Sequence, residues 1–323
     1  MSVSMNADHP AGVLRLLAER QAVGERCALV VVTGTEGGAV RADGALMVVP
    51  EAAAPAGYVS NGCVDADVAA HARRALETGA PARLRYGKGS PFIDIRLPCG
   101  GAIDLAVMPD PDPSVIAAAD AALGGRRRTA LAFDMGRGMV ALGDRERARA
   151  GWAGDVFTAC YQPRLCIRIA GRGPEALALA RLSAASGMEV ILQSPDEDIL
   201  LAAREMGVRD AVRLTTPSAP PLVADDPWTA FVMMFHDRDW EGGLLRQALA
   251  GRAFYIGALG SRRTQAARLD MLAAAGADAA SLRRIRGPIG LVPSQRDASQ
   301  LAISTLAEIV AVSQVAPEVA LAP

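Results

Sequence analysis

Residues 165–176 read LCIRIAGRGPEA, an apolar strand that runs directly into a Gly-x-Gly-x-x-Ala turn and the start of a helix. Glycines in such a turn let the backbone curl tightly, so that the first amides of the helix can face a phosphate. From this stretch to about residue 312, apolar strands and helices alternate along the sequence. The alternation predicts a Rossmann-like, doubly wound parallel sheet with helices on both faces.

The sequence before this stretch has a different rhythm and predicts a separate α+β domain. Helices are expected at residues 11–23, 61–79 and 114–123, and a β-hairpin around the GRG of residues 136–138. The expected strands are CALVVVTG (27–34), ALMVV (45–49), ARLRYG (82–87), FIDIRL (92–97) and AIDLAVMP (102–109). At about 150 residues per domain, a chain of 323 residues has room for two. We divide it into residues 1–155 and 156–323.

Composition excludes several classes of protein. Hydrophobic residues make up 51% and charged residues 21%, so a disordered or fibrous chain is excluded. The net charge is −1 and aromatic residues are 4%, which argues against nucleic acid or an anionic membrane surface as the main partner. No apolar run is long enough to span a bilayer, and the first ten residues lack the layout of a secretory signal. We therefore expect a cytoplasmic protein.

Two of the five cysteines lie in turns where a ligand could reach them. Cys63 stands at the start of the 61–79 helix, and a helix N-terminus favours the thiolate form of cysteine. Cys99 lies in the turn LPCGG, whose glycines allow close approach to a ligand. The alternative is that both are buried, inert thiols. Zinc is disfavoured because the two cysteines are 36 residues apart and none of the three histidines is spaced as a partner ligand.

The other three cysteines carry less information. Cys27 and Cys166 lie in apolar strands and are most simply core residues, whereas Cys160 stays unassigned. In a reducing compartment all five are expected to be thiols.

Two further loops of the second domain carry polar groups at strand ends. The strand TAFVMMF is followed by His236-Asp237, and AFYIGAL by Gly260 and then Ser261-Arg262-Arg263. Ser261 is a candidate N-cap, and two arginines in a first helical turn oppose the helix dipole. Their placement is better explained by a bound anion, because arginine binds phosphate in bidentate fashion. The alternatives are surface salt bridges for the arginines and a hydrogen-bonded structural imidazole for His236.

The Gly171–Gly173 turn is a weak candidate for a nicotinamide site. Glu175 places a negative charge beside the expected phosphate position. The next strand ends in Gln193-Ser194-Pro195, where an acid for a ribose hydroxyl would be needed, and Asp196 comes late. An NAD(P)-dependent oxidoreductase therefore remains only an alternative, and the turn could also serve packing alone.

Taken together, these motifs resemble the XdhC/CoxI family, the accessory factors of molybdenum hydroxylases such as xanthine dehydrogenase. The resemblance covers most of residues 27–108 and 152–311. It rests on SNGCVDADV (60–68), LPCGGAIDL (97–105), QPRL (162–165), FHDRD (235–239), YIGALGSRR (255–263), RIRGPIGL (284–291) and AISTLAEIV (302–310). The resemblance implies a non-catalytic chaperone that binds the molybdenum cofactor. It further implies a cysteine desulfurase as the partner for sulfuration, and delivery of the cofactor to an apo molybdenum hydroxylase.

The resemblance also implies roles for particular residues. Cys63 and Cys99 match the cysteines implied in binding the cofactor, as molybdopterin or its dinucleotide form, and soft thiolates suit molybdenum or its sulfur ligands. The phosphate end could be held at the carboxyl edge of the Rossmann sheet, by Gly171, Gly173, His236, Asp237, Ser261, Arg262 and Arg263. Pro174 stands where the family usually has histidine. A homodimer, in which a partner shields the cofactor, is expected. A thiol redox or sulfur-relay protein is a further alternative, and it would need a reactive Cys63 without a pterin.

Overall fold

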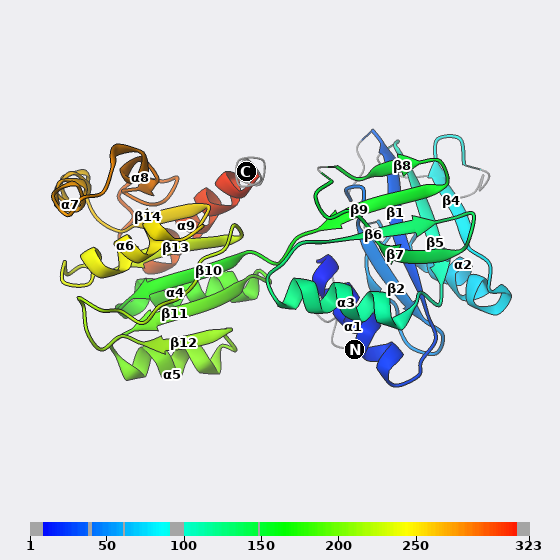
Figure 1. Ribbon diagram of the computed structural model, residues 1–323, viewed down its shortest axis with the longest axis horizontal. Helices are drawn as coiled ribbons and strands as arrows, with labels where there is room; N and C mark the ends of the chain where they lie inside the picture. The colour runs from blue at the N-terminus through cyan, green and yellow to red at the C-terminus, as the bar shows by residue number, and fades with distance from the viewer. Residues whose placement is uncertain (1–8, 38–40, 61, 91–99, 148, 315–323) are drawn as a thin grey trace. The chain divides into compact units, whose positions relative to one another are not determined.

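The computed structural model describes residues 9–37, 41–60, 62–90, 100–147 and 149–314 (Figure 1). The chain divides into two compact units, Met1–Pro163 and Arg164–Pro323. The expected strand at residues 92–97 and the cysteine of the LPCGG turn lie outside the described residues.

The N-terminal unit is built on a five-stranded antiparallel sheet of order β3-β2-β1-β5-β4. Its strands are β1 (Cys27–Glu36), β2 (Leu46–Pro50), β3 (Ala56–Gly57), β4 (Ala82–Gly87) and β5 (Ala102–Pro109). Alternate residues of β1 face opposite sides: Leu29 and Val31 pack with helices α1 (Pro10–Ala22) and α3 (Pro113–Gly124), whereas Val30 and Val32 pack with α2 (Asp65–Thr78). Because both faces of β1 are buried, its sequence is continuously apolar.

A second, four-stranded sheet of order β7-β6-β9-β8 completes this unit. Its strands are β6 (Thr129–Asp134), β7 (Met139–Leu142), β8 (Gly151–Ala153) and β9 (Val156–Tyr161). The hairpin of β6 and β7 was predicted, but β8 and β9 were not. Since β9 pairs along β6, the division between the units falls after Pro163 and not at the expected residue 155.

The C-terminal unit has the predicted Rossmann-like fold. Its six strands are parallel, in the order β12-β11-β10-β13-β14-β15. The bounds are β10 (Cys166–Gly171), β11 (Glu189–Ser194), β12 (Asp210–Arg213), β13 (Thr229–Met234), β14 (Tyr255–Ala258) and β15 (Ile285–Arg286). One face packs against α4 (Gly173–Ala185), α5 (Glu197–Glu205) and α9 (Ala298–Ser313). The other face packs against α6 (Glu241–Ala250), α7 (Arg262–Ala274) and the end of α8 (Ala279–Arg283).

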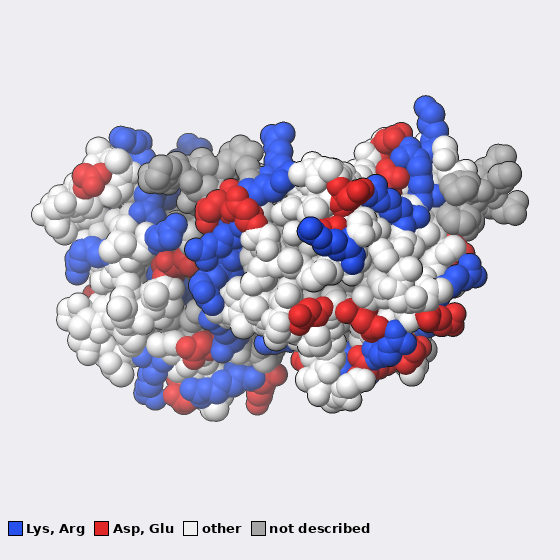
Figure 2. All heavy atoms as spheres, turned by 45° about the vertical axis from the view of Figure 1, so that its right-hand side comes forward, with Lys and Arg blue, Asp and Glu red and all other residues white. Residues whose placement is uncertain are grey.

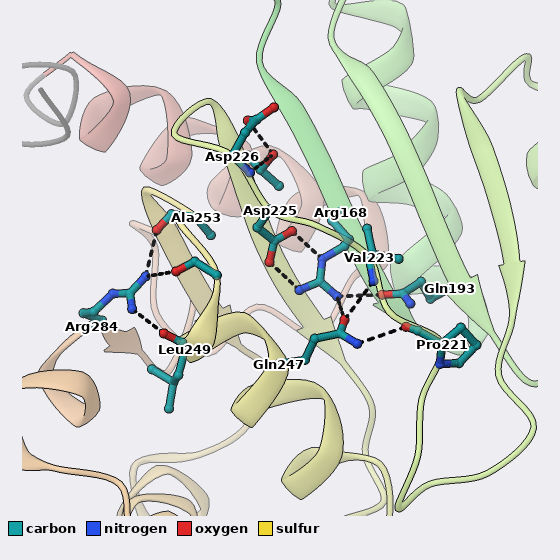
Figure 3. A network of polar contacts seen from close by, with 12 residues as sticks. Arg168, Gln193, Pro221, Val223, Asp225, Asp226, Gln247, Leu249, Ala253 and Arg284 are labelled. Carbon is teal, nitrogen blue, oxygen red and sulfur yellow. Dashed lines mark hydrogen bonds and ion pairs between the residues drawn. The ribbon is translucent and has the colours of Figure 1, made fainter. Parts of the chain in front are cut away.

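A buried polar network replaces a helix on one part of this sheet (Figure 3). Residues 214–228 join β12 to β13 without a helix or strand. Arg168, wholly buried on β10, forms a two-pronged ion pair with Asp225 of this connection, at 2.7 and 2.6 Å. Its Nη1 also donates to Gln193 and to Gln247, and Gln247 donates to the carbonyl of Pro221. The network therefore ties the irregular connection to the sheet and to α6.

The surface carries both signs of charge. Figure 2 shows acidic and basic side chains interspersed among uncharged ones on the face turned to the viewer. None of the helices in the described part of the chain is long and apolar enough to cross a membrane.

Candidate functional site

One end of the five-stranded sheet brings together loops that are distant in sequence. The pairing of Glu36 and Gly87 with Ala102 places the ends of β1 and β4 beside the start of β5. The pairing of Met47 with Gly57 adds the start of β2 and the end of β3. The loop that leads from β3 into α2 carries Cys63, so this cysteine belongs to the same end of the sheet.

Asp65 holds the backbone on which Cys63 stands. One carboxylate oxygen accepts the amides of Val59 (3.0 Å) and Ser60 (3.1 Å), and the other accepts the Ser60 hydroxyl (2.7 Å) and the amide of Gly62 (2.7 Å). Cys63 itself is exposed, which contradicts the alternative that it is a buried, inert thiol. This role of Asp65 was not predicted, yet its place at the first residue of α2 is typical of a carboxylate that binds loop amides.

The segment that follows Cys99 enters the same end of the sheet. Cys99 lies outside the described residues, but Gly101 is described and touches two loops. A Cβ at Gly37 would lie 3.3 Å from the Cα of Gly101, and a Cβ at Gly87 would overlap its carbonyl oxygen. Gly37 and Gly87 therefore allow close backbone contact with Gly101. The predicted approach of a ligand to the LPCGG turn stays a prediction.

A buried tyrosine connects the start of α2 to the end of β4. The Tyr86 hydroxyl donates to Asp67 at 2.6 Å, and burial raises the pKa of Tyr86 far above its usual value. Asp67 lies in the first turn of α2, one helical turn beyond Cys63. The bond thereby brings the Cys63 loop to the strand end that contacts Gly101.

The remaining described cysteines differ from Cys63 in burial. Cys27 and Cys166 are each 1% exposed, as predicted, and burial raises the pKa of Cys27 to about 11. Cys160 is half-buried, with its sulfur 3.1 Å from the carbonyl oxygen of Arg147, and burial raises its pKa as well.

This contrast predicts the order of alkylation of the folded protein. At pH 8 a buried thiol with a pKa of about 11 is almost wholly protonated, and only the thiolate reacts. We expect iodoacetamide to modify Cys63 at least about tenfold faster than Cys27 or Cys166. Peptide mass spectrometry over time measures this, with the unfolded chain in urea as the control for equal intrinsic reactivity. Equal rates at Cys63 and Cys27 in the folded protein would contradict the assigned exposure.

In the C-terminal unit, the predicted polar loops meet at one edge. Strands β10, β11, β13 and β14 are parallel, so their carboxyl ends lie at the same edge of the sheet. From β10 the chain continues outward through β11 and β12, and then returns to form β13 on the other side of β10. The boundary between β10 and β13 is therefore the topological switch point, where ligands bind in such folds.

Glycine stands at each of the two positions of the turn after β10 for a different reason. A Cβ at Gly171 would lie 2.8 Å from both the Cβ and the carbonyl oxygen of Met234, so Gly171 is required for strand packing. Gly173 has φ +74°, and a Cβ there would meet only a carboxylate oxygen of Glu175, at 3.3 Å. Packing therefore explains the first glycine, whereas the second leaves space above the helix start.

Carboxylates dominate this switch point. Arg172, between the two glycines, pairs with Asp237 at 3.2 Å and with Asp196 at 3.4 Å. His236 lies 3.7 Å from Glu175, and its side chain is 75% exposed, which does not favour the alternative of a hydrogen-bonded structural imidazole. Two carboxylates thus pair with the one guanidinium, and Glu175 adds a third negative charge in the first turn of α4. These charges oppose a phosphate, which counts against a dinucleotide at this turn.

The loop after β14 presents arginines as predicted. Ser261 caps α7, because its hydroxyl oxygen accepts the amide of Thr264 at 3.1 Å. Arg262 and Arg263 are exposed, and neither forms an ion pair within the described residues, so surface salt bridges do not explain them. Arg268, which was not singled out, is buried and donates to the carbonyl of Leu259 at 2.7 Å. This bond holds the loop between β14 and α7 in place.

No group of three His, Cys, Asp or Glu side chains suited to a metal ion occurs within the part of the chain that the structure describes.

Both units of the chain match known protein families. Residues 167–309 match the family model described as the XdhC Rossmann domain, and residues 20–87 match that of the XdhC and CoxI family. Over 301 residues the chain is 34% identical to the molybdenum cofactor insertion chaperone PaoD of Escherichia coli (strain K12), covering 93% of this chain and 87% of the relative. A crystal structure described as a xanthine dehydrogenase from Bacillus halodurans has the same fold, with a TM-score of 0.74 and 17% identity over 94% of this chain and 96% of that one.

Proposed function

Because the chain belongs to the XdhC and CoxI family, we propose that it is a molybdenum-cofactor chaperone and not an enzyme. In this proposal it binds the cofactor, supports addition of the terminal sulfido ligand and delivers the product to an apo molybdenum hydroxylase of the xanthine dehydrogenase type. The similarity to a cofactor insertion chaperone supports the first part of this role.

The observation that carries the proposal is the exposed thiol of Cys63 on a backbone fixed by Asp65. A sulfur donor of this kind suits a soft metal centre or its sulfur ligands better than oxygen donors would. The four bonds to Asp65 hold the loop in place before any ligand arrives, which reduces the entropy lost on binding. Cys99 is proposed as the second thiol ligand.

The cofactor consists of a pterin with a dithiolene and a phosphate or nucleotide tail, and its bound molybdenum supplies the redox chemistry of the client enzyme. In the C-terminal unit, Arg262 and Arg263 at the capped start of α7 are the groups proposed for its phosphate end, with Gly171, Gly173, His236, Asp237 and Ser261 at the same edge. The carboxylates around Arg172 make NAD(P) an unfavourable ligand. A cysteine desulfurase, the client hydroxylase and a second copy of the chain are the proposed partners, in the cytoplasm.

The proposal is tested by the cofactor content of purified protein. We expect the double variant Cys63→Ala/Cys99→Ala to retain at least about tenfold less pterin and molybdenum than the parent protein, because it loses both soft ligands. Pterin is measured by fluorescence after oxidation, and molybdenum by elemental analysis. Cys160→Ala is the matched control, since it removes a half-buried thiol elsewhere in the same unit. Equal cofactor in the double variant and the parent would refute the role of the cysteines.

A further inference from the structure

The chain contains 33 arginines and one lysine, Lys88, and this lysine lies at the Cys63 end of the sheet. Its backbone is fixed on both sides: its amide donates to the carbonyl of Gly101 at 3.3 Å, and its carbonyl accepts Arg85 Nε at 3.0 Å. The turn is closed by a bond from the amide of Ser90 to the carbonyl of Gly87 at 3.0 Å. The side chain of Lys88 is exposed. A firmly held turn thus presents an ammonium group beside the strand end that Tyr86 links to the start of α2.

The carboxylates near Lys88 are already neutralised by another residue. Arg85 forms ion pairs with Glu36 at 2.6 Å and with Asp104 at 2.7 Å. Arg85, with a smaller contribution from Lys88, holds the pKa of Glu36 below its usual value. No ion pair of Lys88 itself occurs among the residues that the structure describes. Its charge is therefore available to a ligand.

Arg41 is a second cation at the same end of the sheet, and it forms no ion pair with any residue that the structure describes. It lies in the connection between β1 and β2, and its guanidinium lies over the ring of Tyr58, 5.9 Å from the centroid. Tyr58 begins the loop that Asp65 holds and that ends at Cys63. The Nε of Arg41 is buried and has no hydrogen-bond partner within the described ranges, a costly state for a donor that a bound acceptor would relieve.

A negatively charged ligand beside Cys63 needs such cations. Asp65 and Asp67 both lie in the first turn of α2 and would repel an anion. Arg85 cannot compensate, because it is already paired twice. We propose that Arg41 and Lys88 form the cationic site that receives the anionic part of the cofactor next to Cys63. This inference rests on the proposed function and adds a phosphate- or oxyanion-binding role to the N-terminal unit.

Because Lys88 is the single lysine, its environment can be probed by amine chemistry. Apart from Lys88, the purified chain carries one primary amine, its N-terminal α-amino group, which serves as an internal control. Acetylation is followed by mass spectrometry in cofactor-loaded protein and in the same protein after the cofactor is removed. We expect bound cofactor to slow acetylation of Lys88 at least about fivefold and to leave the α-amino group unaffected. Equal acetylation of Lys88 in both samples would overturn the proposal.

Protein produced without molybdate, which carries metal-free pterin, separates the two sources of negative charge. Protection that persists without the metal assigns Lys88 to the phosphate or dithiolene of the pterin. Protection that requires molybdenum assigns it to the oxyanion of the metal centre.

Variants test both cations together. We expect Arg41→Gln and Lys88→Gln each to weaken cofactor binding about tenfold, and more steeply at low salt than at high salt. Lys88→Arg should bind like the parent protein. Arg74→Gln, which removes an exposed charge from the last turns of α2, is the matched control and should have no effect. If the double Gln variant retains cofactor while Cys63→Ala loses it, the cationic site is wrong and the proposed function stands. If Cys63→Ala/Cys99→Ala leaves binding intact, the role of the cysteines fails. If the purified parent protein carries neither pterin nor molybdenum, the proposed function itself fails.

Discussion

Replacing Arg168 by methionine is expected to lower the free energy of unfolding of the C-terminal unit by about 3–5 kcal/mol. The guanidinium is wholly buried, and it supplies both hydrogen bonds to the buried carboxylate of Asp225. Without it, that carboxylate and the amide oxygen of Gln193 lose their donors, and a buried charge without a partner is strongly destabilising. The connection over residues 214–228 would also lose its link to the sheet.

Urea unfolding followed by tryptophan fluorescence measures this effect, because Trp228 and Trp240 lie in the C-terminal unit. The matched control is Arg172→Met, which breaks half-exposed ion pairs and should cost no more than about 1 kcal/mol. The second variant, Arg168→Met/Asp225→Asn, removes the stranded charge and should recover part of the loss. A loss below about 1 kcal/mol in Arg168→Met would show that the network does not hold the connection.

The architecture was largely predictable because it depends on periodic burial. The central strands β10, β13 and β14 are buried on both faces, so each reads as a short apolar run. The helices between the strands keep a helical spacing of apolar residues. The same reasoning identified β1, α2 and the β6–β7 hairpin. It failed for β8 and β9, where exposed Trp152 and half-buried Val156 dilute the apolar pattern, and this failure displaced the domain boundary.

The polar networks could not be predicted, because their partners are separated in sequence and only the fold brings them together. Arg168 interrupts an apolar strand, and its partner Asp225 lies 57 residues later in an irregular segment. Arg268 likewise pairs with Glu241 on another helix. The pairing of Arg172 with Asp196 and Asp237 follows from strand order and not from local sequence. A single arginine inside an apolar strand was nevertheless a usable signal, since such a charge is almost always paired.

The candidate site was predicted in kind but not in its supporting structure. Sequence placed Cys63 at a helix start and Ser261 at an N-cap, and both positions are confirmed as local geometry. No local pattern indicated that the Asp65 carboxylate accepts four donors from its own loop. The contacts of Lys88 and Arg41 depend on three loops that meet only when the sheet is formed, so no local pattern announces them.

The Gly87→Ala substitution is expected to cost about 4 kcal/mol of stability in the N-terminal unit. Gly87 has φ +87°, where a side chain is strained by about 1–2 kcal/mol. The added Cβ would also overlap the carbonyl oxygen of Gly101, so the backbone of β4 or of the segment entering β5 must move. Thermal unfolding measures the loss. Gly24→Ala is the matched control, because Gly24 has φ +79° with no atom within 4 Å of the added Cβ, and should show the strain alone.

This substitution also separates the position of the cationic turn from its charge. Gly87→Ala keeps Lys88, Arg41 and Cys63, but it displaces the bond between the Lys88 amide and Gly101 on which the turn depends. At a temperature where the variant remains folded, we expect its cofactor content to fall as far as that of Lys88→Gln. This loss, relative to the parent protein, should change less with salt concentration than the loss in Lys88→Gln, because Gly87→Ala retains the charge. If the folded variant binds cofactor as well as Gly24→Ala does, close contact between the two loops is not needed for binding. The glycine would then serve the fold of the sheet alone.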